Sequence, residues 1–127
     1  MFTSYYAKHA TDRNAVAISV KPPSWYVGVT YPILAPTWEL VAAIKNGSIS
    51  EAEYAVEYLK VIKKRGASPY RTLADLGDNA ILLCYEKPED FCHRHIVAWW
   101  IEQELGTPVL ELSTIKNPTL VDEIFTF

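Results

Sequence analysis

The chain has 127 residues, half of them hydrophobic and about a fifth charged, which is typical of a folded globular protein rather than a disordered one. Twelve basic and fifteen acidic residues give a net charge of −3, which argues against a basic nucleic-acid-binding platform. No apolar run approaches the roughly 20 residues of a membrane helix, no secretory signal is visible, and two cysteines are too few for a disulfide scaffold. We therefore expect a soluble, cytoplasmic protein that folds as a single domain over residues 1–127.

Two strands and a long loop are predicted in the first third of the chain. Residues 2–7 (FTSYYA) and 15–20 (AVAISV) are rich in aromatic, β-branched and small apolar residues, which favours strands. Residues 21–36 contain four prolines and a glycine, which exclude a long helix and predict a loop. Loops of this length in compact domains are often functional.

Helices follow. One is expected from Pro36 or Thr37 through Ile44, ending before Gly47. Residues 50–53 (SEAE) form a capping-box pattern, which predicts a second helix that Gly66 ends. A short third helix is expected over residues 68–77, opened by Ser-Pro and closed by glycine.

The last third alternates strand and helix again. Residues 80–85 (AILLCY) are continuously apolar and predict a strand buried on both faces. A helix is expected from about residue 88 to 105, followed by a strand over residues 108–112. In the remaining tail, Ile124, Phe125 and Phe127 need burial on this domain or on a partner chain.

Strands that alternate with helices predict an α/β fold, here a small Rossmann-like three-layer domain with a mostly parallel sheet. Ligands of such sheets bind outside the carboxyl ends of the strands. The pattern therefore directs attention to the loop that follows residues 80–85.

That loop and the start of the helix after it contain the candidate catalytic residues. Glu86 directly follows the buried strand, a partly desolvated position that suits a carboxylate to general acid–base or nucleophilic work. Cys92 stands near a helix N-terminus, which favours a thiolate nucleophile, and His93 is a candidate general base. Arg94 can bind a phosphate or carboxylate. Cys84, inside the strand, is either a core residue or part of the site.

Each role has a structural alternative. Cys92 can be a buried thiol that packs the helix onto the sheet, and Glu89 and Asp90 would oppose its ionisation. Arg94 can instead pair with Glu86, Glu89 or Asp90 and hold the loop in place.

The residues Cys84, Glu86, Cys92, His93 and Arg94, in LLCYE and CHRHIVAWW, resemble the C-x-E and C-H-R motifs of the YeaO-like family, catalogued as domain of unknown function 488. The resemblance is strong over residues 80–105 and extends more weakly over the rest. It implies a small α/β domain of Rossmann-like layering and a site at these motifs, and it implies no particular reaction.

The family's second strand usually carries an acidic residue and an arginine. In this chain Ser19 and Lys21 stand near those places. At this place the chain departs from the family's pattern and lacks the acidic residue.

Other site types fit the motif less well. A phosphate-cradling cysteine loop generally needs glycine, and none lies between Cys84 and Arg94. A zinc site needs about four ligands, and a C-x7-C-H spacing with His9 as a further donor is not a standard pattern. A disulfide between Cys84 and Cys92 is geometrically conceivable, but an intracellular setting disfavours it as a permanent feature.

The function expected from these residues is binding of, or action on, a small nucleotide-type ligand. Glu86, Cys92, His93 and Arg94 would be catalytic. Ser4, Tyr5, Lys21 and Cys84 would bind the ligand, and no metal or cofactor is expected. Aromatic residues near the strand ends would provide a stacking face or pack the sheet: Tyr5, Tyr6, Trp25, Tyr26 and Tyr31.

A second hypothesis is a non-catalytic interaction or regulatory protein that uses the loop of residues 21–38 or the apolar tail. The tail would then also support a homo-oligomer. Nucleic-acid binding through the basic cluster of residues 60–65 is a third and weaker option, because cations at a helix C-terminus already suit the helix dipole.

Overall fold

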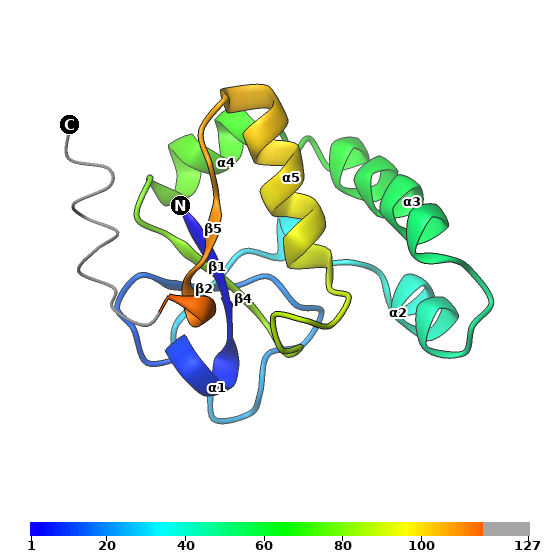
Figure 1. Ribbon diagram of the computed structural model, residues 1–127, viewed down its shortest axis with the longest axis horizontal. Helices are drawn as coiled ribbons and strands as arrows, with labels where there is room; N and C mark the ends of the chain where they lie inside the picture. The colour runs from blue at the N-terminus through cyan, green and yellow to red at the C-terminus, as the bar shows by residue number, and fades with distance from the viewer. Residues whose placement is uncertain (116–127) are drawn as a thin grey trace.

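A five-stranded, all-parallel sheet forms the centre of the computed structural model, which describes residues 1–115 (Figure 1). The strand order is β3-β2-β4-β1-β5. The strands are β1 (Phe2–Tyr5), β2 (Ala15–Ala17), β3 (Val29–Thr30), β4 (Ile81–Cys84) and β5 (Leu110–Glu111). The predicted α/β class with a mostly parallel sheet is confirmed, and in the described part of the chain every strand pair is parallel.

Alternating side chains on the central strands fill two separate hydrophobic clusters. Val16 of β2 and Leu82 of β4 point to the face that carries the larger helices, while Ala17 and Leu83 point to the other face. This alternation follows from the two-residue period of a strand, and burial on both faces explains why β4 is continuously apolar.

Four helices cover the first face: α2 (Trp38–Lys45), α3 (Glu51–Lys64), α4 (Pro69–Leu76) and α5 (His93–Leu105). Helix α5 lies between α3 and α4 and contacts both of them, as well as β1 and β4 (Figure 1). The Ser50–Glu53 capping box begins α3, and the Ser68 hydroxyl caps α4, as the sequence predicts.

The opposite face has a thinner cover. It consists of α1 (Tyr6–His9) and the 3-10 turn η2 (Leu112–Thr114), both of which contact β1. Tyr6 packs there edge-on against Tyr26 and Tyr85, with ring centroids 5.5 and 4.9 Å apart. The two unequal covers give the domain the three-layer character that the sequence predicts.

Several boundaries differ from the prediction, and β2, expected over residues 15–20, already ends at Ala17. The chain leaves β1 after Tyr5 and enters the one-turn helix α1, whereas a strand to residue 7 was expected. The predicted loop of residues 21–36 contains β3 and a 3-10 turn, η1 (Pro32–Leu34). Helix α5 starts at His93 rather than near residue 88, because Cys92 is extended at the N-cap and Lys87 and Asp90 close a turn before it.

No helix in the described part of the chain is long and apolar enough to cross a membrane. The apolar tail with Ile124, Phe125 and Phe127 lies outside the described residues, so its predicted burial stays a prediction.

Candidate functional site

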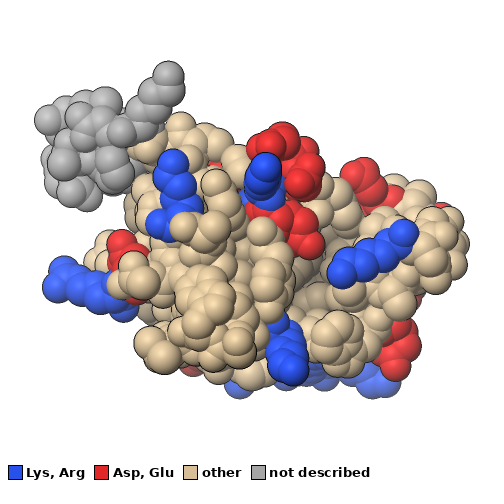
Figure 2. All heavy atoms as spheres, turned by 90° about the horizontal axis from the view of Figure 1, so that it is seen from below, with Lys and Arg blue, Asp and Glu red and all other residues tan. Residues whose placement is uncertain are grey.

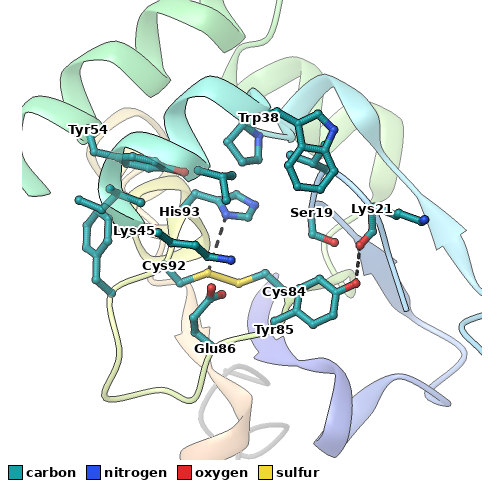
Figure 3. A pocket seen from close by; sticks show the side chains of 15 residues that line it. Ser19, Lys21, Trp38, Lys45, Tyr54, Cys84, Tyr85, Glu86, Cys92 and His93 are labelled. Atoms are coloured by element: carbon teal, nitrogen blue, oxygen red, sulfur yellow. Dashed lines mark hydrogen bonds between the residues drawn. A yellow bond between two sulfur atoms is a disulfide. The ribbon is translucent and has the colours of Figure 1, made fainter. Parts of the chain in front are cut away.

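A cavity of about 510 Å³ opens at the carboxyl ends of β2 and β4 (Figure 3). Its lining comes from the segments that follow these two strands, from helices α2 and α3, and from the start of α5. This is the edge at which parallel sheets bind ligands. Of the expected site residues, the cavity brings together Lys21, Cys84, Glu86, Cys92 and His93.

Cys84 and Cys92 are joined by a disulfide at the base of this cavity (Figure 3). Cys84 is the last residue of β4 and Cys92 is the N-cap of α5, so the turn between them returns the chain to the same edge of the sheet. Both residues are buried and both line the cavity. The sequence analysis disfavours this disulfide as a permanent feature, whereas the structure has the two sulfurs joined. In this state neither sulfur is a free nucleophile.

His93 is buried between Cys92 and Ile18, the residue that follows β2. Its Nε2 lies 2.8 Å from the carbonyl oxygen of Ile18, and because a carbonyl only accepts, Nε2 carries the proton. The other ring nitrogen, Nδ1, then has a free lone pair and lies 3.8 Å from Cys92 Sγ. Burial lowers the pKa of His93 to about 4, so the ring is neutral at pH 7.

Arg94 lies behind the disulfide and is fully buried. Its Nη1 donates to Cys84 Sγ at 2.9 Å. Its Nε and Nη2 donate to the two carboxylate oxygens of Glu111, at 3.0 and 3.3 Å. The alternative pairing of Arg94 with Glu86, Glu89 or Asp90 is wrong, because the guanidinium pairs with Glu111 of β5 instead.

Glu111 was not among the expected site residues. It is paired beside Thr3 in the sheet, and Thr3 Oγ1 donates to it at 2.7 Å. Ser113 also donates to this carboxylate. Burial raises the pKa of Glu111, but the hydrogen bonds from Arg94, Ser113 and Thr3 outweigh that effect and lower it below its usual value. Glu111 is therefore an anion that matches the buried Arg94 cation.

The charged residues of the cavity are few. Glu86 is half-buried, and its carboxylate lies beside the disulfide (Figure 3). Lys45, from α2, extends its ammonium toward the cavity, whereas the ammonium of Lys21 points away from the sulfurs (Figure 3). Glu89 and Asp90 do not line the cavity.

Ser4 and Tyr5 do not line the cavity. Ser4 is buried on the α1 side of the sheet, where its Oγ lies 2.5 Å from His9 Nδ1. Because side chains alternate along β1, Ser4 faces away from the Cys84 and Leu82 side of the sheet.

Aromatic rings form part of the cavity wall, but not the rings that the sequence singles out. Trp38 of α2, Tyr54 of α3 and Phe91 line it, and Tyr54 meets Phe91 edge-on with centroids 5.2 Å apart. Tyr26 packs on Tyr6, and Tyr31 donates to Asp75. The helical spacing of apolar residues places Tyr54 on the buried face of its helix. It does not predict that α2 and α3 extend over the carboxyl ends of the strands.

Cys84, Cys92 and His93 are also the three donors of the described chain that lie close enough to share a metal ion, with donor atoms within 4.8 Å of one another. The disulfide removes both thiolates from such a set, and His9 lies elsewhere, bonded to Ser4. The donor set of this oxidised state therefore does not fit the four-ligand zinc site that the sequence left open.

Comparison with known proteins gives one match. A family model described as "DUF488-N3a: Active DUF488-N3 subclade" matches residues 7–105, a span that contains every residue lining the cavity. No curated protein and no solved structure gave a significant match. The matched span covers well over half of the chain and includes both the Cys-x-Glu and the Cys-His-Arg motifs. The chain therefore belongs to the DUF488 family, in its N3a subclade, and the resemblance read from these motifs is confirmed.

Proposed function

We propose that this protein binds a small nucleotide-type ligand in the cavity at the carboxyl ends of β2 and β4, and acts on it there. The observation that carries the proposal is the composition of this cavity. It joins aromatic walls to a carboxylate, an ammonium group and the Cys92–His93 pair at one edge of a parallel sheet.

The size of the cavity supports this ligand class. Cavities that enclose small molecules have volumes of about 300–1,000 Å³, and the volume here is about 510 Å³. Trp38, Tyr54 and Phe91 offer ring faces and edges to a flat base.

The charges support an anionic ligand with polar groups. Lys45 is placed to meet a phosphate, and Glu86 is placed to accept a hydrogen bond from a sugar hydroxyl or a base amine. The carboxylates of Glu89 and Asp90, which would repel a phosphate, do not line the cavity. On the face toward which the strands run, most Lys and Arg side chains stand apart from one another (Figure 2), which favours a small ligand over a nucleic acid.

Of the residues expected to be catalytic, Glu86, Cys92 and His93 line the cavity, whereas Arg94 does not. We assign Glu86 the role of acid–base carboxylate, and Arg94 the role of a positioning residue behind the sulfurs. The matched family model describes its subclade as active, which favours an enzyme over a passive binder.

Calorimetric titration tests the binding. We expect a nucleoside monophosphate to bind, and Lys45→Ala to weaken it about tenfold while leaving the matching nucleoside unaffected, since one exposed charge–phosphate contact is worth about 1–1.5 kcal/mol. Trp38→Ala should weaken both ligands. Lys63→Ala, which removes an exposed charge on α3 away from the cavity, is the matched control. Equal dissociation constants for all variants, or no binding by any nucleotide of a broad panel, would refute the proposal.

A second candidate function rests on the loop before β3. Trp25 is 57% exposed and Val27 is 98% exposed, which favours a contact surface for another protein chain. Sedimentation of the wild type and of a Trp25→Ala, Val27→Ser variant tests whether this surface joins two copies. A wild-type monomer at high concentration would count against that use of the loop.

A further inference from the structure

We propose that Cys84 and Cys92 form a polarised dithiol–disulfide exchange pair, in which a small external thiol attacks Cys92 and Cys84 leaves as a thiolate held by Arg94. This activity goes beyond the proposed ligand binding and does not depend on it. It rests on the different partners of the two sulfurs.

Cys84 has a cationic partner. Arg94 Nη1 donates to Cys84 Sγ at 2.9 Å, and Arg94 has no exposed surface. A charge-assisted hydrogen bond from a buried guanidinium favours the thiolate over the thiol. The orientation of the guanidinium is set by Glu111, which accepts from Nε and Nη2, so that Nη1 is directed to the sulfur.

Cys92 has a neutral partner. His93 keeps its proton on Nε2, bonded to the Ile18 carbonyl, and presents the lone pair of Nδ1 to Cys92 Sγ. In the reduced protein this lone pair accepts the S–H of Cys92 and favours its thiol form. As the N-cap residue, Cys92 makes no side-chain hydrogen bond to the first turn of α5, so the helix adds no direct N–H contact.

The chemistry follows from this difference. An external thiolate forms a bond to Cys92 Sγ, the Cys84–Cys92 bond breaks, and its electron pair goes to Cys84 Sγ. A second external thiolate attacks the external sulfur of this mixed disulfide, and Cys92 leaves and takes a proton from solvent. Two thiols are thereby oxidised to a disulfide, and the protein disulfide is reduced to a dithiol. The leaving thiol of lower pKa leaves faster, which selects Cys84.

Access is through the same cavity. Both cysteines line it, and their sulfurs lie at its base (Figure 3). Both cysteines are buried, which limits the partner to a low-molecular-weight thiol. Glu111 is then a positioning residue for the exchange, since it contacts neither sulfur and acts through Arg94.

Cysteamine is a suitable probe because it is small. The oxidised full-length protein is mixed with cysteamine, quenched with acid and digested, and the mixed disulfides are assigned by mass spectrometry. We expect the adduct on Cys92 to exceed that on Cys84 at least tenfold. Equal adducts, or an excess on Cys84, would overturn the polarity. No adduct and no reduction at all would overturn the exchange activity.

The pH dependence of alkylation gives a second measurement. In the Cys92→Ser variant Cys84 is the remaining cysteine, and in the Cys84→Ser variant Cys92 is the remaining cysteine. We expect Cys84 to react with iodoacetamide with the lower apparent pKa, and Glu111→Gln in the Cys92→Ser background to raise that pKa. Glu57→Gln, which removes an exposed carboxylate of α3, should leave it unchanged. A Cys84 pKa at or above that of Cys92 would contradict the role of Arg94.

These measurements are separate from the test of nucleotide binding. A protein that exchanges with cysteamine but binds no nucleotide would disprove only the proposed function. If Glu111→Gln fails to fold, the two single-cysteine proteins still decide the polarity.

Discussion

Arg94 combines a structural and a chemical role in one side chain. A buried guanidinium is costly unless its charge and its N–H groups are satisfied, and Glu111 and Cys84 satisfy them together. The hydrogen bond from Arg94 to Cys84 helps to satisfy the buried guanidinium, and it also places a cation beside the Cys84 sulfur. Fold stability and sulfur chemistry are therefore linked at this residue.

His93 links stability to pH. Its pKa is lowered by burial to about 4 in the folded state, against about 6.5 in an unfolded chain. Between these values the unfolded state binds more protons, so the unfolding free energy is complete above pH 6.5 and falls as the pH decreases toward 4. The loss amounts to up to about 3 kcal/mol.

Urea unfolding at pH 7.5 and pH 4.5 measures this loss. We expect His93→Gln to lose about 2 kcal/mol less than the wild type over this interval, because its side chain does not titrate. His9→Gln is the matched control, since it also replaces a histidine but one that is only partly buried. If His93→Gln and the wild type lose the same free energy, His93 is not neutral and buried as described.

The sequence identifies the motif residues but not all of their partners. Cys84, Glu86, Cys92 and His93 are close in sequence, and a strand–turn–helix unit is enough to predict that they meet. The partner of Arg94 is 17 residues further along, on β5. It depends on the pairing of β5 beside β1, which no local pattern predicts.

Among the elements, those with strong local signals are the ones predicted best. The capping box before α3 shows this, because the Ser50 hydroxyl accepts from the Glu53 amide and the Glu53 carboxylate accepts from the Ser50 amide. Strand β3 has no such signal. It has two exposed residues at the edge of the sheet, and it forms because Val29 and Thr30 pair with β2.

Ser50→Ala should lower the free energy of unfolding by about 1 kcal/mol, since the cap of α3 is lost. Thermal unfolding of the purified protein measures this. Ser48→Ala, in the turn before the helix, is the control and should have a much smaller effect. An unchanged melting temperature for Ser50→Ala would mean that packing of Tyr54 and Tyr58 alone determines where α3 begins.

On the scale of the whole molecule, the strand order places the cavity. Because β4 inserts between β1 and β2, the segments that follow β2 and β4 meet at one edge, and α5 returns over them. The parallel sheet and this edge could be predicted from the alternation of strands and helices. The overhang of α2 and α3, which supplies Trp38, Lys45 and Tyr54, could not, because it depends on packing between distant segments.

A crystal structure of the protein soaked with a nucleoside monophosphate tests the central claim most directly. The account predicts density for the base against Trp38, Tyr54 or Phe91, with the phosphate near Lys45 and a polar group of the ligand within hydrogen-bonding distance of Glu86. Ligand density away from the carboxyl ends of β2 and β4, or an empty cavity at saturating ligand, would contradict it.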